Sequence, residues 1–405
     1  MQTILCIASF FKGNEFIREC RRQGARVVLL TREKVAKEEW ARDALDDLVA
    51  IPGRSSVQAY LMAASEIARR HQISRVVALE EYDIVTAAHI REHLCVPGMG
   101  ATTARYFQDK LAMRVKARDL GIPQPDFVPL VNHQSINEFI NQVAPPWMLK
   151  PRVGASSMGM KKFSLAGDVW AAAMELDARN ETHERSDFHL LEQFVAGAVY
   201  HVDSLIQGGK VQFSNVSRYG TPPFDIVHGG GVTTSQTVPH GSSFRRRLLA
   251  LNRKVLRGFG IERGVTHAEF IEPLDSNRGV MFLEVAARVG GAYTAETIEA
   301  GTGINMWREW ARIELATNER PYILPEPRKD YSGIALSLAR QEWPTTRDYT
   351  DPEIVFRIPK RDHVGLIVRS NKHERVTQLL EDYAERFSRD FTAVMPAEER
   401  AEQHL

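Results

Sequence analysis

The stretch WMLKPRVGASSMGMKKF, Trp147 to Phe163, contains two glycines, Gly154 and Gly159, in the spacing GxxxxG. A Walker A phosphate loop has this spacing, but it continues with lysine and then serine or threonine. Here Met160 and Lys161 follow instead. A Walker loop also joins a strand to a helix, whereas both WMLK before the glycines and MKKFSL after them are expected to be strands. The stretch therefore predicts a glycine-rich flap between antiparallel strands.

Such a flap can bind phosphate. Backbone N–H groups of Gly154, Ser156, Ser157 and Gly159 can close over phosphate oxygens, and Lys150 on the preceding strand can place a cation against them. A surface hairpin with solvated lysines is the alternative. This stretch alone does not decide between the two.

A second hairpin predicts two opposed carboxylates. The turn LDSNRG separates VTHAEFIE from VMFLEVAA, and if it centres on Ser276 and Asn277, then Glu269 opposes Glu284. Opposed Cβ atoms lie about 5 Å apart, and like charges so placed are unfavourable unless they are neutralised. Mg²⁺ would neutralise them, because it takes carboxylate oxygens together with substrate phosphates; Mn²⁺ is an alternative. A register slip of one residue would separate the pair.

The same strand face carries further polar groups. His267 would oppose Ala286, and Arg288 follows two residues later. Since the flanking positions are apolar, a solvated face with a local salt bridge is the less favoured alternative. Glu192, in LLEQFVAGAVYHVD, ends a strand before an apolar bend where backbone groups could contact an adenine edge.

Composition favours a globular protein that acts on small ligands. The chain has 405 residues, 43% of them apolar, which suits two or three packed domains. Lysine plus arginine number 52 against 51 aspartate plus glutamate, so no basic field favours nucleic acid or a membrane surface. No apolar run approaches the roughly 18 residues of a membrane span, and no leader is expected before the first strand. The cysteines Cys6, Cys20 and Cys95 are expected to be free thiols in the cytoplasm.

The order of elements predicts a mixed α/β and α+β protein. In residues 1–100, short apolar runs such as TILCIA, ARVVLL and SRVVAL alternate with helical patterns, which indicates a parallel sheet covered by helices. This N-terminal domain is Rossmann-like in outline, but SFFKGNE after the first strand lacks the GxGxxG of a dinucleotide site. Residues 101–320 contain a second domain with antiparallel strands, and residues 321–405 are expected to form a small C-terminal α+β subdomain.

Taken in order, these elements resemble the ATP-grasp superfamily, in particular its carboxylate–amine ligases, which include L-amino-acid ligases. The resemblance extends from about Ile4 to Thr317. Six stretches carry it, in the family's order and at its intervals: ALEEYD, PGMGATTARYFQDKLAMRVKARDLGIPQP, MLKPRVGASSMGM, LLEQFVAGAVYHVD, VTHAEFI and FLEVAARVGGAY. It implies that residues 101–320 form a two-lobed ATP-grasp domain that binds ATP.

The resemblance assigns nucleotide-binding roles to matching positions. Lys110 and Lys150 are expected at the nucleotide phosphates, with the flap from Gly154 to Gly159 closing over them. Glu192 and Val195 are expected beside the adenine, Val195 through its backbone.

The resemblance also implies catalytic roles. Glu269 and Glu284 are the implied Mg²⁺ ligands, which agrees with the register argument above. Arg288 is expected to stabilise the transferring γ-phosphoryl group and the acyl phosphate, with Lys150 beside it. His267 is expected near the phosphates or the substrate.

Two positions depart from the family pattern. Ala286 stands where asparagine often follows the second metal glutamate, although some amino-acid ligases share this departure. Val199 stands where many members have an acidic residue that holds the ribose, which leaves His201 or Asp203 as substitutes.

The function implied by the resemblance is ATP-dependent amide formation through an acyl phosphate, with a small carboxylate and a small amine as substrates. The family's tendency to dimerise leads us to expect a homodimer. Two alternatives remain: an ATP-grasp kinase or carboxyphosphate-forming enzyme, and an ATP-binding module without catalysis. A further loop, YGTPPFDIVHGGGVTTSQTVP, is expected on the substrate side, with Arg218 and His228 as candidates for a substrate carboxylate.

Overall fold

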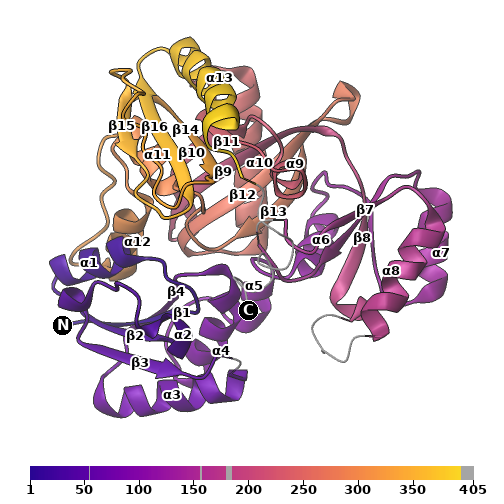
Figure 1. Ribbon diagram of the computed structural model, residues 1–405. Coiled ribbons are helices and arrows are strands. Elements are labelled where there is room, and N and C mark those ends of the chain that lie inside the picture. Colours follow the sequence, from indigo (N-terminus) through magenta and orange to yellow (C-terminus); the bar gives the residue numbers. More distant parts are fainter. Residues whose placement is uncertain (54, 156, 179–184, 394–405) are drawn as a thin grey trace.

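The N-terminal part of the chain forms a parallel sheet with helices on both faces, at the lower left of Figure 1. The computed structural model describes residues 1–53, 55–155, 157–178 and 185–393. The strands are β1 (Thr3–Ala8), β2 (Arg26–Arg32), β3 (Asp47–Ile51) and β4 (Arg75–Ala78), in the order β3-β2-β1-β4. The helices are α1 (Asn14–Arg22), α2 (Glu33–Ala36), α3 (Val57–Arg70) and α4 (Ile84–His93), with 3-10 turns η1 (Arg42–Ala44) and η2 (Glu81–Asp83).

A small antiparallel lobe follows, at the right of Figure 1. Two helices, α5 (Ala101–Arg105) and α6 (Lys110–Asp119), lead into it. Its elements are β5 (Phe127–Pro129), α7 (His133–Gln142), β6 (Trp147–Pro151), β7 (Lys161–Phe163), α8 (Ala166–Ala178), η4 (Ser186–Phe188) and β8 (His189–Gln193). The strand order is β5-β8-β6-β7, and β6 pairs antiparallel with β7. The glycine-rich stretch therefore joins two antiparallel strands, as predicted.

The rest of the chain builds an eight-stranded sheet in the order β13-β12-β9-β10-β11-β14-β16-β15, whose bounds are β9 (Gly197–Gln207), β10 (Lys210–Tyr219), β11 (Thr233–Thr237), β12 (Arg263–Pro273), β13 (Met281–Ala286), β14 (Tyr331–Leu338), β15 (Ile354–Arg357) and β16 (His363–Ser370). Its helical segments are α9 (Pro223–Gly229), α10 (Ser243–Phe259), η5 (Ser276–Arg278), α11 (Thr294–Thr302), α12 (Met306–Leu315) and α13 (His373–Asp390). The expected α/β and α+β fold class is confirmed. The boundary at residue 320 remains a prediction, and β14, β15 and β16 belong to the same sheet as β9 to β13.

The N-terminal sheet shares its cores with the later domain. Alternate residues of β1 point to opposite faces, as in any strand. Leu5 and Ile7 belong to a core that includes α3, α4 and the strands β9, β12 and β13. Ile4 and Cys6 belong to a second core with α1 and with Trp310 of α12. These shared cores fix the carboxyl end of β4 against the eight-stranded sheet.

Among the helices in the described segments, none combines the length and the apolarity needed to cross a bilayer.

Candidate active site

A pocket lies beneath the flap that joins β6 and β7. Six predicted site residues line it: Lys110, Lys150, Gly154, Ser157, Glu269 and Glu284. Other lining residues are Pro151, Ala155, Met158, Met160, Val199, Pro222, Pro223, Phe224 and Leu283. The predicted site residue Ser156 lies outside the described residues. Because these positions come from α6, the small lobe and the large sheet, only the fold brings them together.

Lys110 begins α6 and connects the flap to the large sheet. Its Nζ donates to the carbonyl oxygen of Gly154 at 2.6 Å and lies 3.4 Å from Oε2 of Glu284. Burial disfavours its charge, but the carboxylates of Glu284 and Glu81 outweigh burial and raise the pKa of Lys110. The buried ammonium is therefore a permanent cation at the pocket wall.

Lys150 is held by a buried carboxylate. Oε2 of Glu192 on β8 lies 2.6 Å from Lys150 Nζ, and Oε1 accepts from Nε of Arg114 at 2.6 Å. Burial alone would raise the Glu192 pKa, but Arg114 and Lys150 outweigh it and lower that pKa to about 2. Glu192 thus orients Lys150, and its predicted adenine contact remains a prediction.

Sequence reasoning missed Arg114, although a signal was present. Arg114 lies four residues after Lys110 on α6, so both side chains lie on one helix face. Its side chain is 2% exposed, which for a guanidinium requires a buried partner.

Two further residues predicted to contact the nucleotide, Val195 and Gly159, have defined positions in the structure. Val195 packs in an apolar cluster with Val199 and Leu283, two residues that line the pocket. Gly159 has a φ of +68°, and a Cβ there would lie 2.9 Å from Cγ of Pro151. Glycine at this position therefore lets the flap return close over β6.

The predicted carboxylate pair is present. Glu269 on β12 pairs with Glu284 on β13, and His267 pairs with Ala286, in the predicted register. Beyond Glu269 the pairing shifts, because Leu283 is the extra residue of a β-bulge. The hairpin turn is thus irregular, yet the register holds at the two glutamates.

These two carboxylates fit a divalent cation. Oε1 of Glu269 accepts from the Tyr219 hydroxyl at 3.1 Å and lies 3.5 Å from Nε2 of His267. Oε2 of Glu284 contacts Lys110. Among the described residues, the recorded polar contacts thus use one oxygen of each carboxylate and leave the other for a cation. Two carboxylates with room for phosphate oxygens match the ligand preference of Mg²⁺.

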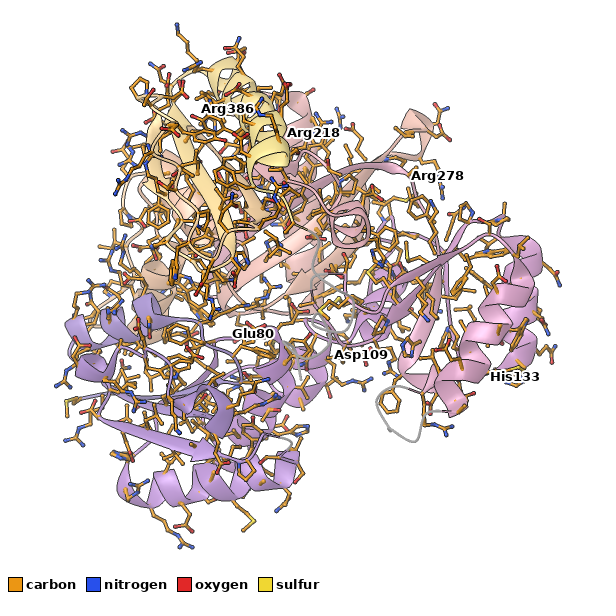
Figure 2. The ribbon with its side chains drawn as sticks, viewed as in Figure 1. Glu80, Asp109, His133, Arg218, Arg278 and Arg386 are labelled. Atoms are coloured by element: carbon orange, nitrogen blue, oxygen red, sulfur yellow. The ribbon has the colours of Figure 1, made fainter. Side chains whose placement is uncertain are left out.

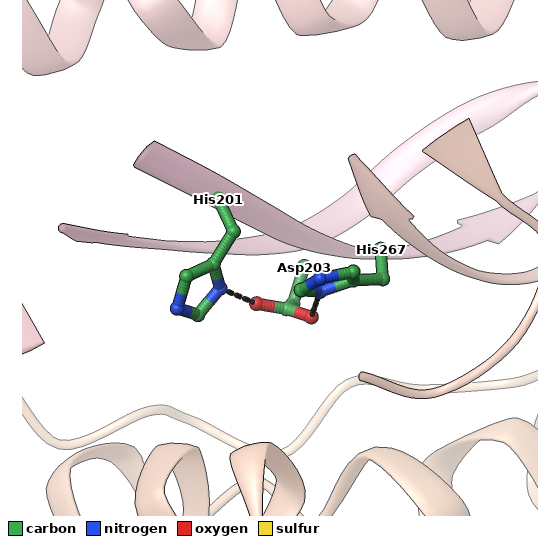
Figure 3. Close-up of side chains that lie close together, drawn as sticks. All are labelled: His201, Asp203 and His267. Carbon is green, nitrogen blue, oxygen red and sulfur yellow. Dashed lines mark hydrogen bonds and ion pairs between the residues drawn. The ribbon is translucent and has the colours of Figure 1, made fainter. Parts of the chain in front are cut away.

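His267 belongs to a buried His–Asp–His cluster (Figure 3). Oδ1 and Oδ2 of Asp203 lie 2.8 Å from Nδ1 of His267 and 2.6 Å from Nδ1 of His201, respectively. Burial opposes the imidazolium, but Asp203 outweighs it and raises the pKa of His267 to about 9. The spacing of the three side chains would suit a metal, but Asp203 already accepts from both rings. We interpret the cluster as a hydrogen-bonded support for His267 and Glu269.

Neither substitute for the ribose contact lies on the pocket wall. The side chains of His201 and Asp203 form a hydrogen bond with each other, and the two residues are only 3% and 1% exposed. The extra loop lies beside the flap: Pro222 and Phe224 line the pocket, and Nε2 of His228 lies 3.0 Å from the Met160 carbonyl oxygen. Arg218 is exposed. The expected role of this loop toward a substrate therefore remains a prediction.

Arg288 contacts the N-terminal domain. Its Nη2 and Nε donate to Oε2 of Glu81 at 2.7 and 3.1 Å. Burial lowers the Arg288 pKa, but Glu81, Glu80 and Glu284 outweigh burial and raise it. Figure 2 shows Glu80 near the junction of the N-terminal domain with the rest of the chain. The sequence predicted a role for Arg288 but gave no indication that Glu81 would be its partner.

Comparisons with known proteins identify an ATP-grasp domain within this chain. Residues 143–296 match the family model described as ATP-grasp domain. The chain is 24% identical over 259 residues to an L-arginine-specific L-amino acid ligase of Bacillus subtilis. The aligned region covers 62% of this chain and 60% of that enzyme. It thus matches less than two thirds of that relative's length. An uncharacterised protein of Sinorhizobium fredii is 22% identical, over 88% of this chain and 72% of its own.

Solved structures share the fold. The L-amino acid ligase from Bacillus licheniformis superposes with a TM-score of 0.75 at 16% identity, over 94% of this chain and 96% of its own. A carboxyaminoimidazole ribonucleotide synthase from Aspergillus clavatus, solved with ATP, gives 0.71 at 16% identity, over 95% and 98%. The resemblance to ATP-grasp carboxylate–amine ligases is confirmed, and the chain carries an ATP-grasp domain.

Proposed function

We propose that the protein is an ATP-dependent ligase that joins a small carboxylate to a small amine. One observation carries this proposal: Glu269 and Glu284 oppose each other in a pocket that also holds Lys110 and Lys150 under a glycine-rich flap. Amino-acid-like substrates are favoured because the curated relative and a structural neighbour are named as L-amino acid ligases.

The proposed reaction has two transfers. The substrate carboxylate attacks the γ-phosphorus of ATP, and the bond from that phosphorus to the β–γ bridging oxygen breaks. ADP departs, and the substrate becomes an acyl phosphate. The amine then attacks the acyl carbon, loses a proton, and displaces phosphate to form an amide. No protein nucleophile is required, so the chain contributes position and charge.

Each charged group has a part in this scheme. Lys110 and Lys150 hold the nucleotide phosphates, and Glu192 keeps Lys150 aimed at the pocket. Glu269 and Glu284 would hold Mg²⁺ or Mn²⁺, which supplies positive charge against the phosphate oxygens. Arg288 stabilises negative charge on the phosphoryl group in transfer. The flap excludes water that would hydrolyse the acyl phosphate.

A substrate-pair screen tests the proposal. ADP and phosphate should appear only when an acid and an amine are both present, and mass spectrometry should find the amide. ATP consumption that never depends on an amine would sink the ligase and favour the kinase or carboxyphosphate alternative. Nucleotide binding that is indifferent to Mg²⁺, without turnover, would favour the non-catalytic module.

A matched pair of variants ties the activity to the carboxylates. Glu284→Gln should lower turnover about 100-fold or more, as expected when a preorganised charge is lost from an active site. Glu272→Gln on β12, whose carboxylate accepts from the Tyr200 hydroxyl outside the pocket lining, should stay near wild type. Equal losses in both variants would contradict the assignment.

Location and assembly are also part of the proposal. Cys6, Cys20 and Cys95 are all unpaired, which supports a reducing cytoplasm. The expected homodimer rests on the family resemblance, and size-exclusion chromatography with light scattering would test it.

A further inference from the structure

The guanidinium of Arg288 is held by a carboxylate that lies 207 positions away in the sequence. Two of its N–H groups share Oε2 of Glu81, and Nη1 donates to the carbonyl oxygen of Val289 at 3.1 Å. The paired side chains of Arg288 and Glu81 are only 12% and 6% exposed. The contact therefore joins the end of β13 to the carboxyl end of β4, in water-poor surroundings where such a pair is strong.

Glu81 is itself firmly placed. Its carbonyl oxygen accepts from Nε2 of Gln108 at 2.9 Å. Two residues later, Asp83 accepts from the Ser9 backbone N–H at 2.6 Å. Both ends of η2 are thus tied, one to the segment before α6 and the other to the end of β1. A carboxylate on such a turn can fix a partner's position rather than follow it.

Without Glu81, other anions would compete for Arg288. The carboxylates of Glu80 and Glu284 both stabilise the positive charge of Arg288, and Glu80 is already paired with Lys12 at 2.6 Å. Glu284 is the carboxylate proposed to hold the cation. A released guanidinium would therefore be drawn toward the metal side of the pocket and away from its present position.

We propose that Glu81 is a positioning residue that holds Arg288 where it meets the phosphoryl group in transfer. The inference rests on the proposed function, because it takes the role of Arg288 from there. Glu81 does not line the pocket and acts through Arg288, so the N-terminal domain takes part in phosphoryl transfer without contributing to the pocket wall.

A matched control exists within the same chain. Glu19 on α1 is 2% exposed and accepts from Nε of Arg312 on α12 at 2.7 Å. Like Glu81, it is a buried carboxylate of the N-terminal domain that pairs with an arginine from the later part of the chain. It does not line the pocket, so Glu19→Gln reports the effect of weakening the domain contact alone.

The test uses ADP with Mg²⁺, with and without aluminium fluoride, which mimics a phosphoryl group in transfer. Calorimetry gives the ADP affinity in each condition. In wild type, aluminium fluoride should tighten ADP binding. Glu81→Gln should reduce this gain about tenfold or more, since charge-assisted hydrogen bonds orient the arginine, and leave the affinity for ADP alone within about twofold. Glu81→Asp should recover part of the gain, and Glu19→Gln should keep all of it.

Several outcomes would overturn the inference. These are an undiminished gain in Glu81→Gln, an equal loss in Glu19→Gln, or no gain in wild type. If Glu81→Gln fails to fold, a full gain in Glu81→Asp would also overturn it. The substrate-pair screen on wild type is a separate readout: its failure removes the proposed ligase, whereas the aluminium fluoride comparison still reports whether Glu81 governs Arg288.

Discussion

Replacing Glu192 by glutamine should destabilise the protein strongly, because it leaves two cations without their shared partner. Glu192 is 1% exposed and contacts Arg114 at 2.6 and 3.3 Å and Lys150 at 2.6 Å. Glutamine has nearly the same shape, so packing is preserved and the change is mainly electrostatic. The buried guanidinium of Arg114 would then lack its counter-charge.

Two routes give a similar magnitude. Removing one partner of a buried ion pair costs about 3–5 kcal/mol. Independently, the Glu192 pKa is lowered from 4.5 to about 2, which corresponds to about 3 kcal/mol of stabilisation at neutral pH. Because the folded-state pKa is the lower one, this contribution is present above pH 4.5 and is lost as pH falls toward 2.

The assay is urea-induced unfolding, followed by circular dichroism at pH 7 and at pH 3. Glu192→Gln should lower the free energy of unfolding by about 3 kcal/mol at pH 7, with a smaller difference at pH 3. Glu272→Gln, which loses one hydrogen bond from Tyr200, should cost about 1 kcal/mol. A loss below about 1 kcal/mol for Glu192→Gln, or one that does not change with pH, would refute the reasoning.

Three further predictions follow from the pocket and its surroundings. Gly159→Ala should weaken ADP binding about tenfold in calorimetry, since φ at Gly159 is +68° and the new Cβ would meet Pro151. The control Gly167→Ala, whose Cβ would meet no described atom within 4 Å, should leave the ADP affinity unchanged. Burial raises the Asp83 pKa to about 6, so the stabilisation from Asp83 is full below pH 3.8 and is lost as pH rises through 6. Relative to Asp83→Asn, wild type should lose about 2 kcal/mol of unfolding free energy between pH 4 and 7 in urea titrations, and parallel profiles would contradict this. Chelation by EDTA should stop phosphate release and Mg²⁺ or Mn²⁺ should restore it; undiminished release in EDTA would exclude the proposed metal role.

Much of the architecture follows from local patterns. The apolar run TILCIA is buried at all six positions, as expected for a central parallel strand. The bounds of α10 also follow from local residues, because Ser242 caps its start and Gly260 follows its end. By contrast, β3 was not predicted, since DLVAI is short and only half-buried, with a weak apolar pattern.

The pairing of Glu269 with Glu284 could be predicted because hairpin register depends on nearby residues. The bulge at Leu283 could not, since it depends on which side chains the core accepts. Phe282 lies in the main core, whereas Leu283 contacts the apolar cluster at the pocket. A count of residues around the turn contains no information about that choice.

The sequence by itself determined the strand–flap–strand unit around Gly154, the opposed glutamates and the alternation of strands and helices in residues 1–100, since each depends on neighbours in the chain. Only the tertiary structure decided the partners of the charged groups. Glu192 meets Arg114 and Lys150, Asp203 meets two histidines, and Glu81 meets Arg288. The physical reason is burial: a charge in a water-poor interior requires a counter-charge, and which one it finds depends on how distant segments pack.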